Sequence, residues 1–64
     1  MTTIPRALSR ATNELAQVSD TPRLDAELLM AEALHIDRDK LILAPPQGDA
    51  PKRFFEMIDR RKEG

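Results

Sequence analysis

Apolar residues recur at helical spacing along the first quarter of the chain. Their steps alternate between four and three residues, at Ile4, Leu8, Ala11, Leu15 and Val18. This spacing places them on one face of a helix. Thr3 suits the N-cap, and Pro5 falls in the first turn, where a missing amide hydrogen costs nothing. The pattern predicts a helix from Thr3 to Val18.

The segment from Leu24 to Leu34 predicts a second helix that is apolar on two sides. Pro22, just before it, suits the first position of a helix. One apolar stripe holds Leu24, Leu28, Ala31 and Leu34. The other holds Ala26, Leu29, Met30 and Ala33. Because such a helix usually contacts more than one neighbour, we place it at the centre of the fold and expect Leu28→Ala to cost roughly 2–5 kcal/mol.

Two further helices are predicted in the second half of the chain. Asp37 suits the N-cap of a short helix that ends at Ala44. After a loop, Asp49 or Ala50 caps a last helix that starts at Pro51. Its main stripe holds Phe54, Met57, Ile58 and Arg61. Four helices with short connections predict an all-α fold, a small four-helix bundle with room for one extra short helical turn.

Length and composition restrict the class of protein. Sixty-four residues allow one domain, residues 1–64, of marginal stability. The absence of Cys excludes disulfides and thiolate metal sites. Ten Lys and Arg against 11 Asp and Glu leave a net charge of −1, without the basic excess of a nucleic-acid-binding protein. No apolar run resembles a membrane span or a signal peptide. We expect a soluble, cytoplasmic, monomeric domain that binds neither nucleic acid nor membrane.

The single histidine belongs to the only candidate metal site. His35 follows the second helix, with Asp37 and Asp39 close by in sequence. A metal could take all three, but the arrangement is more typical of a helix that ends and another that begins. Histidine is also enriched at positive φ, which a residue that ends a helix often needs. We therefore predict no metal site.

No group of residues has the pattern of an active site. The second helix carries the carboxylates Asp25, Glu27 and Glu32. We interpret them as solvated, because general acid–base catalysis needs a carboxyl group tuned by a cleft. The only serines and glycines are Ser9, Ser19, Gly48 and Gly64, without a nucleophile elbow or a phosphate-binding loop. We predict no catalytic and no cofactor-binding residue, and the substrate-binding residues stay unidentified.

Two clusters near the end of the chain allow a structural and a binding interpretation. Of Phe54 and Phe55, one could be an exposed anchor for a partner, but we expect both to be partly buried against the first two helices. The basic run 60–62 could be a binding patch; we favour a frayed helix end whose charges complement the helix dipole. The exposed pairs of Glu56 should matter little, so Glu56→Ala is expected to be nearly silent.

Several blocks of the sequence resemble a known family. They are Pro-Arg-Leu-Asp-Ala-Glu-Leu-Leu at 22–29, the stretch 34–43, Phe54, and Arg-Arg-x-x-Gly at 60–64. From about Arg6 onward the chain is similar to the N-terminal domain of the HemK family. Members of that family are glutamine methyltransferases that act on peptide chain release factors.

The resemblance implies a non-catalytic helical domain that precedes a larger, Rossmann-like catalytic domain. That domain would use S-adenosylmethionine to methylate the release factor in its Gly-Gly-Gln loop, while the helical domain helps to position the factor. The family's Asn-Pro-Pro-Tyr signature and glycine-rich cofactor loop are absent from the 64 residues, so no catalytic or cofactor residue carries over. His35 departs from the family, whose members usually have Gly at the end of the second helix. The expected partners are the release factor and the protein's own catalytic domain.

Three other classes of small helical protein are less well supported by the sequence. A free-standing protein-interaction module, the main alternative, would need an exposed apolar patch of a few hundred Å². An acyl carrier protein needs Asp-Ser-Leu where this chain has residues 21–24, Thr-Pro-Arg-Leu. A helix-turn-helix protein would read DNA with residues 37–44, whose two basic side chains are balanced by two acidic ones.

Overall fold

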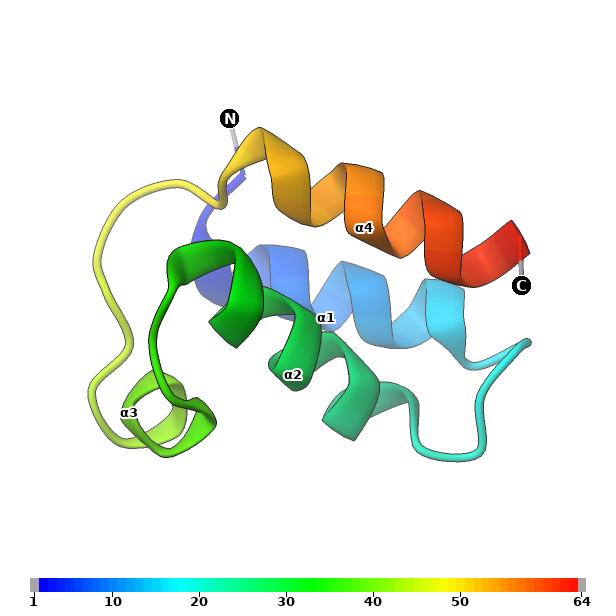
Figure 1. Ribbon diagram of the computed structural model, residues 1–64, viewed down its shortest axis with the longest axis horizontal. Coiled ribbons are helices and arrows are strands. Elements are labelled where there is room, and N and C mark those ends of the chain that lie inside the picture. The colour runs from blue at the N-terminus through cyan, green and yellow to red at the C-terminus, as the bar shows by residue number, and fades with distance from the viewer. Residues whose placement is uncertain (1, 64) are drawn as a thin grey trace.

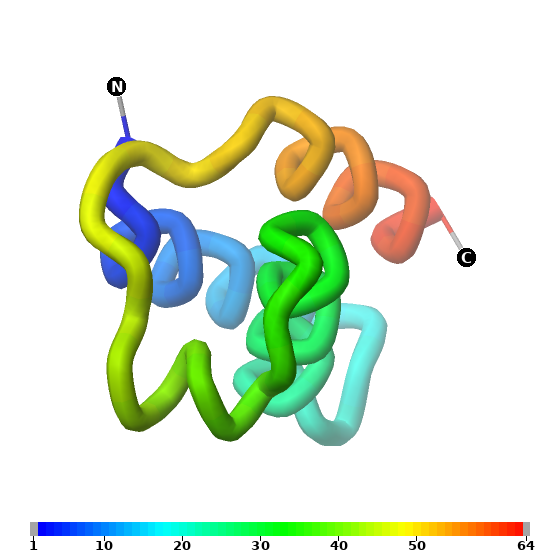
Figure 2. Tube along the Cα trace, turned by 60° about the vertical axis from the view of Figure 1, so that its left-hand side comes forward, coloured from blue at the N-terminus to red at the C-terminus, as the bar shows by residue number. Residues whose placement is uncertain are grey.

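The computed structural model describes residues 2–63, which form four helices: α1 (Ile4–Leu15), α2 (Pro22–Leu34), α3 (Arg38–Leu43) and α4 (Lys52–Glu63). In Figure 1, α1 and α4 run in the same direction and α2 runs back against them, while α3 lies at one end. Figure 2 shows α2 between α3 and α4, and α2 contacts each of the other three helices. No strand forms within residues 2–63. The all-α prediction is therefore confirmed.

Helix α1 begins as predicted and ends earlier than predicted. The Thr3 hydroxyl accepts a hydrogen bond from the amide of Arg6 at 3.4 Å, as an N-cap should. The helix stops at Leu15, and the amide of Val18 bonds to the Leu15 carbonyl at 3.0 Å in a tighter turn. Val18 is 46% exposed. The predicted extension to Val18 is wrong, because the chain must turn here to enter α2.

A small polar network builds the turn between α1 and α2. The Ser19 hydroxyl donates to a carboxylate oxygen of Asp25 and accepts from the amide of Thr21 at 3.0 Å. Pro22 is the first residue of α2, as its fixed φ predicts. The carboxylate of Asp25 thus lies in the first turn of α2, where the helix dipole favours a negative charge.

Helix α2 ends in the left-handed conformation predicted for His35. Its φ is 59°, the only positive value at a non-glycine residue within 2–63. The amide of Ile36 bonds to the Ala31 carbonyl at 3.0 Å, and the amide of His35 bonds to the Glu32 carbonyl at 3.2 Å. This is the hydrogen-bond pattern of a Schellman ending, in which the left-handed residue turns the chain away from the helix axis.

The third and fourth helices follow the predicted boundaries closely. Asp37 is the residue before α3, although its side chain makes no capping hydrogen bond, and Ala44 follows its last residue. Helix α4 begins one residue after Pro51. The loop between them is attached to the start of the chain, since the amide of Ala50 bonds to the Thr2 carbonyl at 2.8 Å.

The core lies where α1, α2 and α4 meet, and α2 contacts all three other helices. The central position predicted for α2 is therefore confirmed. The buried apolar residues are Ile4, Ala7, Leu8, Ala11, Leu15, Ala26, Met30, Ala31, Ala33, Leu41, Phe54 and Ile58.

Of the two apolar stripes predicted for α2, one faces the core. Met30 and three alanines make the contact, whereas on the other stripe Leu24 is 38% exposed and Leu28 is 49% exposed. The prediction that Leu28 is a core residue is wrong. A face of small side chains lets neighbouring helices approach closely, and the leucines on the second apolar side of the helix then stay outside the core.

Candidate functional site

Exposed apolar side chains are concentrated on two adjacent helices. Of five large hydrophobic residues exposed within residues 2–63, four lie on α2 or α3: Leu24, Leu28, Ile42 and Leu43. We call these four residues the α2–α3 surface. Leu43 is the most exposed, at 84%, and Ile42 reaches 49%. Single exposed hydrophobic residues are ordinary, but their concentration on neighbouring elements is typical of an interaction site.

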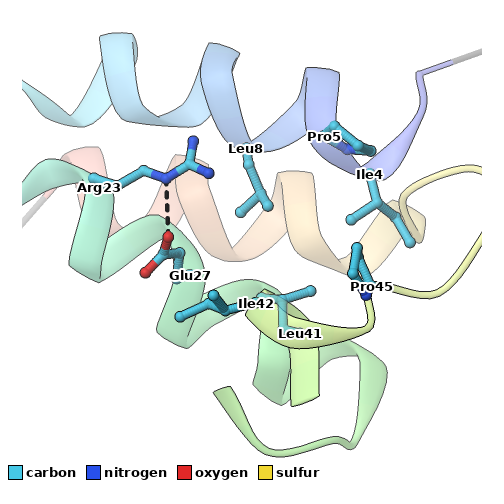
Figure 3. Close-up of a pocket in the computed structure, with 8 residues that line it drawn as sticks. All are labelled: Ile4, Pro5, Leu8, Arg23, Glu27, Leu41, Ile42 and Pro45. Atoms are coloured by element: carbon cyan, nitrogen blue, oxygen red, sulfur yellow. Dashed lines mark hydrogen bonds and ion pairs between the residues drawn. The ribbon is translucent and has the colours of Figure 1, made fainter. Parts of the chain in front are cut away.

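A cavity of about 160 Å³ opens beside this surface, between α1, α2 and α3. Helix α1 contributes Ile4 and Leu8, and α3 contributes Leu41 and Ile42 (Figure 3). The remaining lining residues are Pro5, Arg23, Glu27 and Pro45. Ile4, Leu8 and Leu41 are core residues, so the floor of the cavity is held by the packing of the fold. Ile42 links the cavity to the α2–α3 surface.

The polar part of this cavity is an ion triad centred on Glu27. One carboxylate oxygen accepts from Nε of Arg23 at 2.9 Å. The other accepts from Arg38, at 3.1 Å from Nε and 2.9 Å from Nη2. Glu27 is only 8% exposed, so the predicted solvated face does not include it. The triad joins α2 to α3 through Arg38 and accounts for the burial of a charge that the sequence pattern alone places in solvent.

The electrostatics of the triad leave positive charge at the cavity. Burial raises the pKa of Glu27, but the hydrogen bonds from Arg23 and Arg38 outweigh it and hold the pKa below its ordinary value. Glu27 is therefore ionised at neutral pH, and two guanidinium charges face one carboxylate. The terminal nitrogens of Arg23 have no hydrogen-bond partner within residues 2–63, and 54% of this side chain is exposed. They can bind an incoming acceptor.

The candidate metal residues do not converge. No group of three or more His, Asp or Glu side chains within residues 2–63 could hold a metal ion. The ring of His35 lies instead 3.0 Å from a terminal nitrogen of Arg53, on the exposed surface. His35 serves as the helix-ending residue that the sequence favoured over a ligand.

The two phenylalanines have different environments. Phe54 is completely buried, whereas Phe55 is half-buried, and their rings meet edge to face with centroids 5.5 Å apart. Neither ring is an exposed anchor for a partner. Phe54 is thus a central core residue, more buried than predicted.

The basic run at the end of α4 connects helices. A terminal nitrogen of Arg61 lies 3.4 Å from the Asp25 carboxylate on α2, and Nζ of Lys62 lies 2.8 Å from the Glu14 carboxylate on α1. The run lies in the last turn of α4, where its charges complement the helix dipole as predicted. The frayed end predicted here is wrong for Arg61 and Lys62, since both side chains pair with other helices.

The two serines also have structural settings: Ser19 bonds to Asp25, and Ser9 is exposed on α1.

The apolar cavity and the α2–α3 surface were missed by reasoning from the sequence. Helical periodicity showed that α2 has two apolar stripes, but it did not show which stripe faces the neighbours. One signal was available in the spacing of Arg23 and Glu27, four residues apart on a helix, which is the geometry of an ion pair. The second cation, Arg38, comes from another helix and could be placed only in three dimensions.

No helix within residues 2–63 is long and apolar enough to cross a membrane.

Comparison with known proteins identifies the family. No curated protein and no solved structure matches the chain. The family model described as the PrmC N-terminal domain matches residues 6–64, which include most of α1 and all of the three helices that follow. The chain therefore belongs to the PrmC N-terminal domain family, the helical N-terminal domain of release factor methyltransferases of the PrmC/HemK type.

Proposed function

We propose that this domain binds a peptide chain release factor and positions it for methylation of a glutamine by a catalytic domain elsewhere in the same protein. The family match over residues 6–64 supports the methyltransferase context. S-adenosylmethionine is the proposed methyl donor, bound by the catalytic domain. In this proposal the helical domain supplies binding energy and no chemical group.

The observation that carries the proposal is the α2–α3 surface with its adjoining cavity. A domain of 64 residues has few large apolar side chains for its core, yet four of them lie exposed on two adjacent helices. Exposed apolar area of this kind is typical of a surface that a protein partner covers. Binding energy gained at such a remote surface can orient a reacting group held by another domain.

Deletion of residues 1–64 from the complete protein tests this function. We expect KM for the intact release factor to rise at least tenfold, because the remote contacts are lost. In this proposal a short peptide carrying the Gly-Gly-Gln sequence lacks the remote contacts, so its kinetic constants should stay unchanged. An unchanged KM for the intact factor, with a folded catalytic domain, would overturn the proposal.

A free-standing interaction module is the second candidate, because the same exposed residues would serve it. The sequence of the gene beyond the Gly64 codon separates the two. A glycine-rich strand–loop–helix followed by Asn-Pro-Pro-Tyr would support the methyltransferase, whereas a stop codon would favour the module.

A further inference from the structure

We propose that the cavity between α1, α2 and α3 receives one apolar side chain of the release factor, and that Arg23 at its rim binds a carboxylate beside that side chain. This inference rests on the proposed function and narrows it to a single contact. The occupant is an apolar residue next to an acidic one on the surface of the partner protein.

The size of the cavity suits one side chain. Its volume of about 160 Å³ is close to that of engineered protein cavities of about 150 Å³ that accept benzene. A side chain of the size of Leu, Met or Phe therefore fits, and a helix does not. Pro5 and Pro45 line the cavity and are rigid, and the core residue Leu41 also lines it. The site is thus formed before binding, which lowers the entropy cost of association.

The positive charge of Arg23 at the rim of the cavity favours an acidic residue next to the apolar side chain of the partner. Glu27 occupies Nε of Arg23 and leaves the two terminal nitrogens free within residues 2–63. Figure 3 shows this guanidinium next to Leu8 and bonded to the Glu27 carboxylate, and all three residues line the cavity. A guanidinium with two free donors matches a carboxylate, and the excess positive charge of the triad repels a lysine. A partner segment with an acidic residue beside the apolar one satisfies both parts of the site.

The other hollows of the surface do not combine these features. The one between α2 and α4 has two arginines, but its apolar residues are only partly buried and no core residue lines it. The one beside α1 and α4 contains Arg10, Glu14 and Asp59, and Arg10 already pairs with Glu14 at 3.5 Å. The cavity at Arg23 joins three core residues, a cationic rim with free donors and an exposed apolar side chain, Ile42.

Two exposed apolar residues provide a matched test. Ile42 lines the cavity and is 49% exposed, whereas Val18, which is 46% exposed, lies outside both the cavity and the α2–α3 surface. In the complete protein, we expect Ile42→Asp to raise KM for the release factor at least tenfold. Val18→Asp introduces the same charge at a comparable exposure and should change KM less than threefold. Melting curves followed by circular dichroism verify that both variants are folded.

The charged contact has its own matched pair. Arg23 and Arg10 each pair with a glutamate four residues on, but only Arg23 lines this cavity. We expect Arg23→Gln to raise KM for the release factor and to weaken its dependence on salt concentration. Arg10→Gln should leave both unchanged.

The outcomes test the proposed cavity contact and the proposed function of the domain separately. If deletion of residues 1–64 raises KM while Ile42→Asp and Arg23→Gln do not, the cavity contact is wrong and the function stands. If Val18→Asp raises KM as much as Ile42→Asp does, the effect is not specific to the cavity, and the contact is likewise overturned. If the deletion leaves KM unchanged, both proposals fail.

Discussion

At the residue scale, two carboxylates of α2 are held in their ionised form. A hydrogen bond from the Ser19 hydroxyl, supported by Arg61, lowers the pKa of Asp25 from its ordinary value of 3.8. The two arginines of the triad lower the pKa of Glu27 from 4.5. A carboxyl group with a lower pKa in the folded state stabilises that state above its ordinary pKa, and the contribution is lost as the pH falls through the folded pKa.

Acid is therefore expected to destabilise the domain. We predict a constant melting temperature from neutral pH down to about pH 5.5 and a fall below about pH 4.5, where these groups begin to protonate in the unfolded state. Glu27→Gln should lower the melting temperature at pH 7, and its further loss in acid should be smaller than that of the wild type. Glu32→Gln, at an exposed position of the same helix, is the control. Parallel curves for the wild type and Glu27→Gln would contradict the assignment.

His35 carries a conformational cost at the end of α2. A side chain with a β-carbon is strained at a φ of 59°, and glycine is not. We predict that His35→Gly stabilises the domain by about 0.5–1 kcal/mol relative to His35→Ala, which keeps the β-carbon. Urea denaturation of the two variants measures the difference. Both substitutions remove the exposed contact with Arg53, so the loss of that contact does not affect the difference between them. Equal stabilities would show that the left-handed position is not strained.

At the element scale, α2 decides how the bundle packs. Met30 is completely buried, whereas Leu28 is half exposed. Met30→Ala is expected to cost about 2–5 kcal/mol, because it leaves a cavity among α1, α2 and α4. Leu28→Ala should cost less than about 1 kcal/mol. Both values follow from urea denaturation, with Glu56→Ala as a surface control. A larger loss for Leu28→Ala than for Met30→Ala would contradict the orientation of α2.

The boundaries of the elements followed from local chemistry. Thr3, Pro22, His35 and Asp37 mark helix ends in the sequence, and each lies at or beside a helix end in the structure. These residues act through their own backbone or through groups within one helical turn, so no knowledge of the tertiary fold is needed. Val18 is the exception, since the turn into α2 overrides the apolar periodicity.

At the scale of the whole molecule, residues 2–63 form a packed helical core that holds the α2–α3 surface in place. Three helices enclose the core, and α3 adds its apolar side chains beside the cavity. The end of α4 is joined to α1 and α2 through Lys62 and Arg61. These ion pairs are partly exposed, so water and salt screen them and their contribution to stability is small.

The isolated chain is expected to transfer no methyl group. Its one apolar cavity at the α2–α3 surface has a volume of about 160 Å³ and contains no general base in reach of a substrate, because the carboxylate of Glu27 is occupied by two arginines. Incubation with S-adenosylmethionine and unmodified release factor, followed by mass spectrometry, checks this. A mass increase of one methyl group would contradict the non-catalytic role.

The sequence by itself determined the helical class, most of the helix ends and the family. Those features depend on periodicity, on capping residues and on blocks of consecutive residues, all of which are local. Only the tertiary structure decided which face of α2 is buried, since an apolar residue can contact either the core or a partner with the same local pattern. Only the tertiary structure also showed the ion pair between Arg38 and Glu27 and the cavity beside Arg23, because both arise from contacts between separate helices. The core of the domain was thus predictable in part from residue spacing, whereas its exposed apolar surface consists of the side chains that helix packing leaves in solvent.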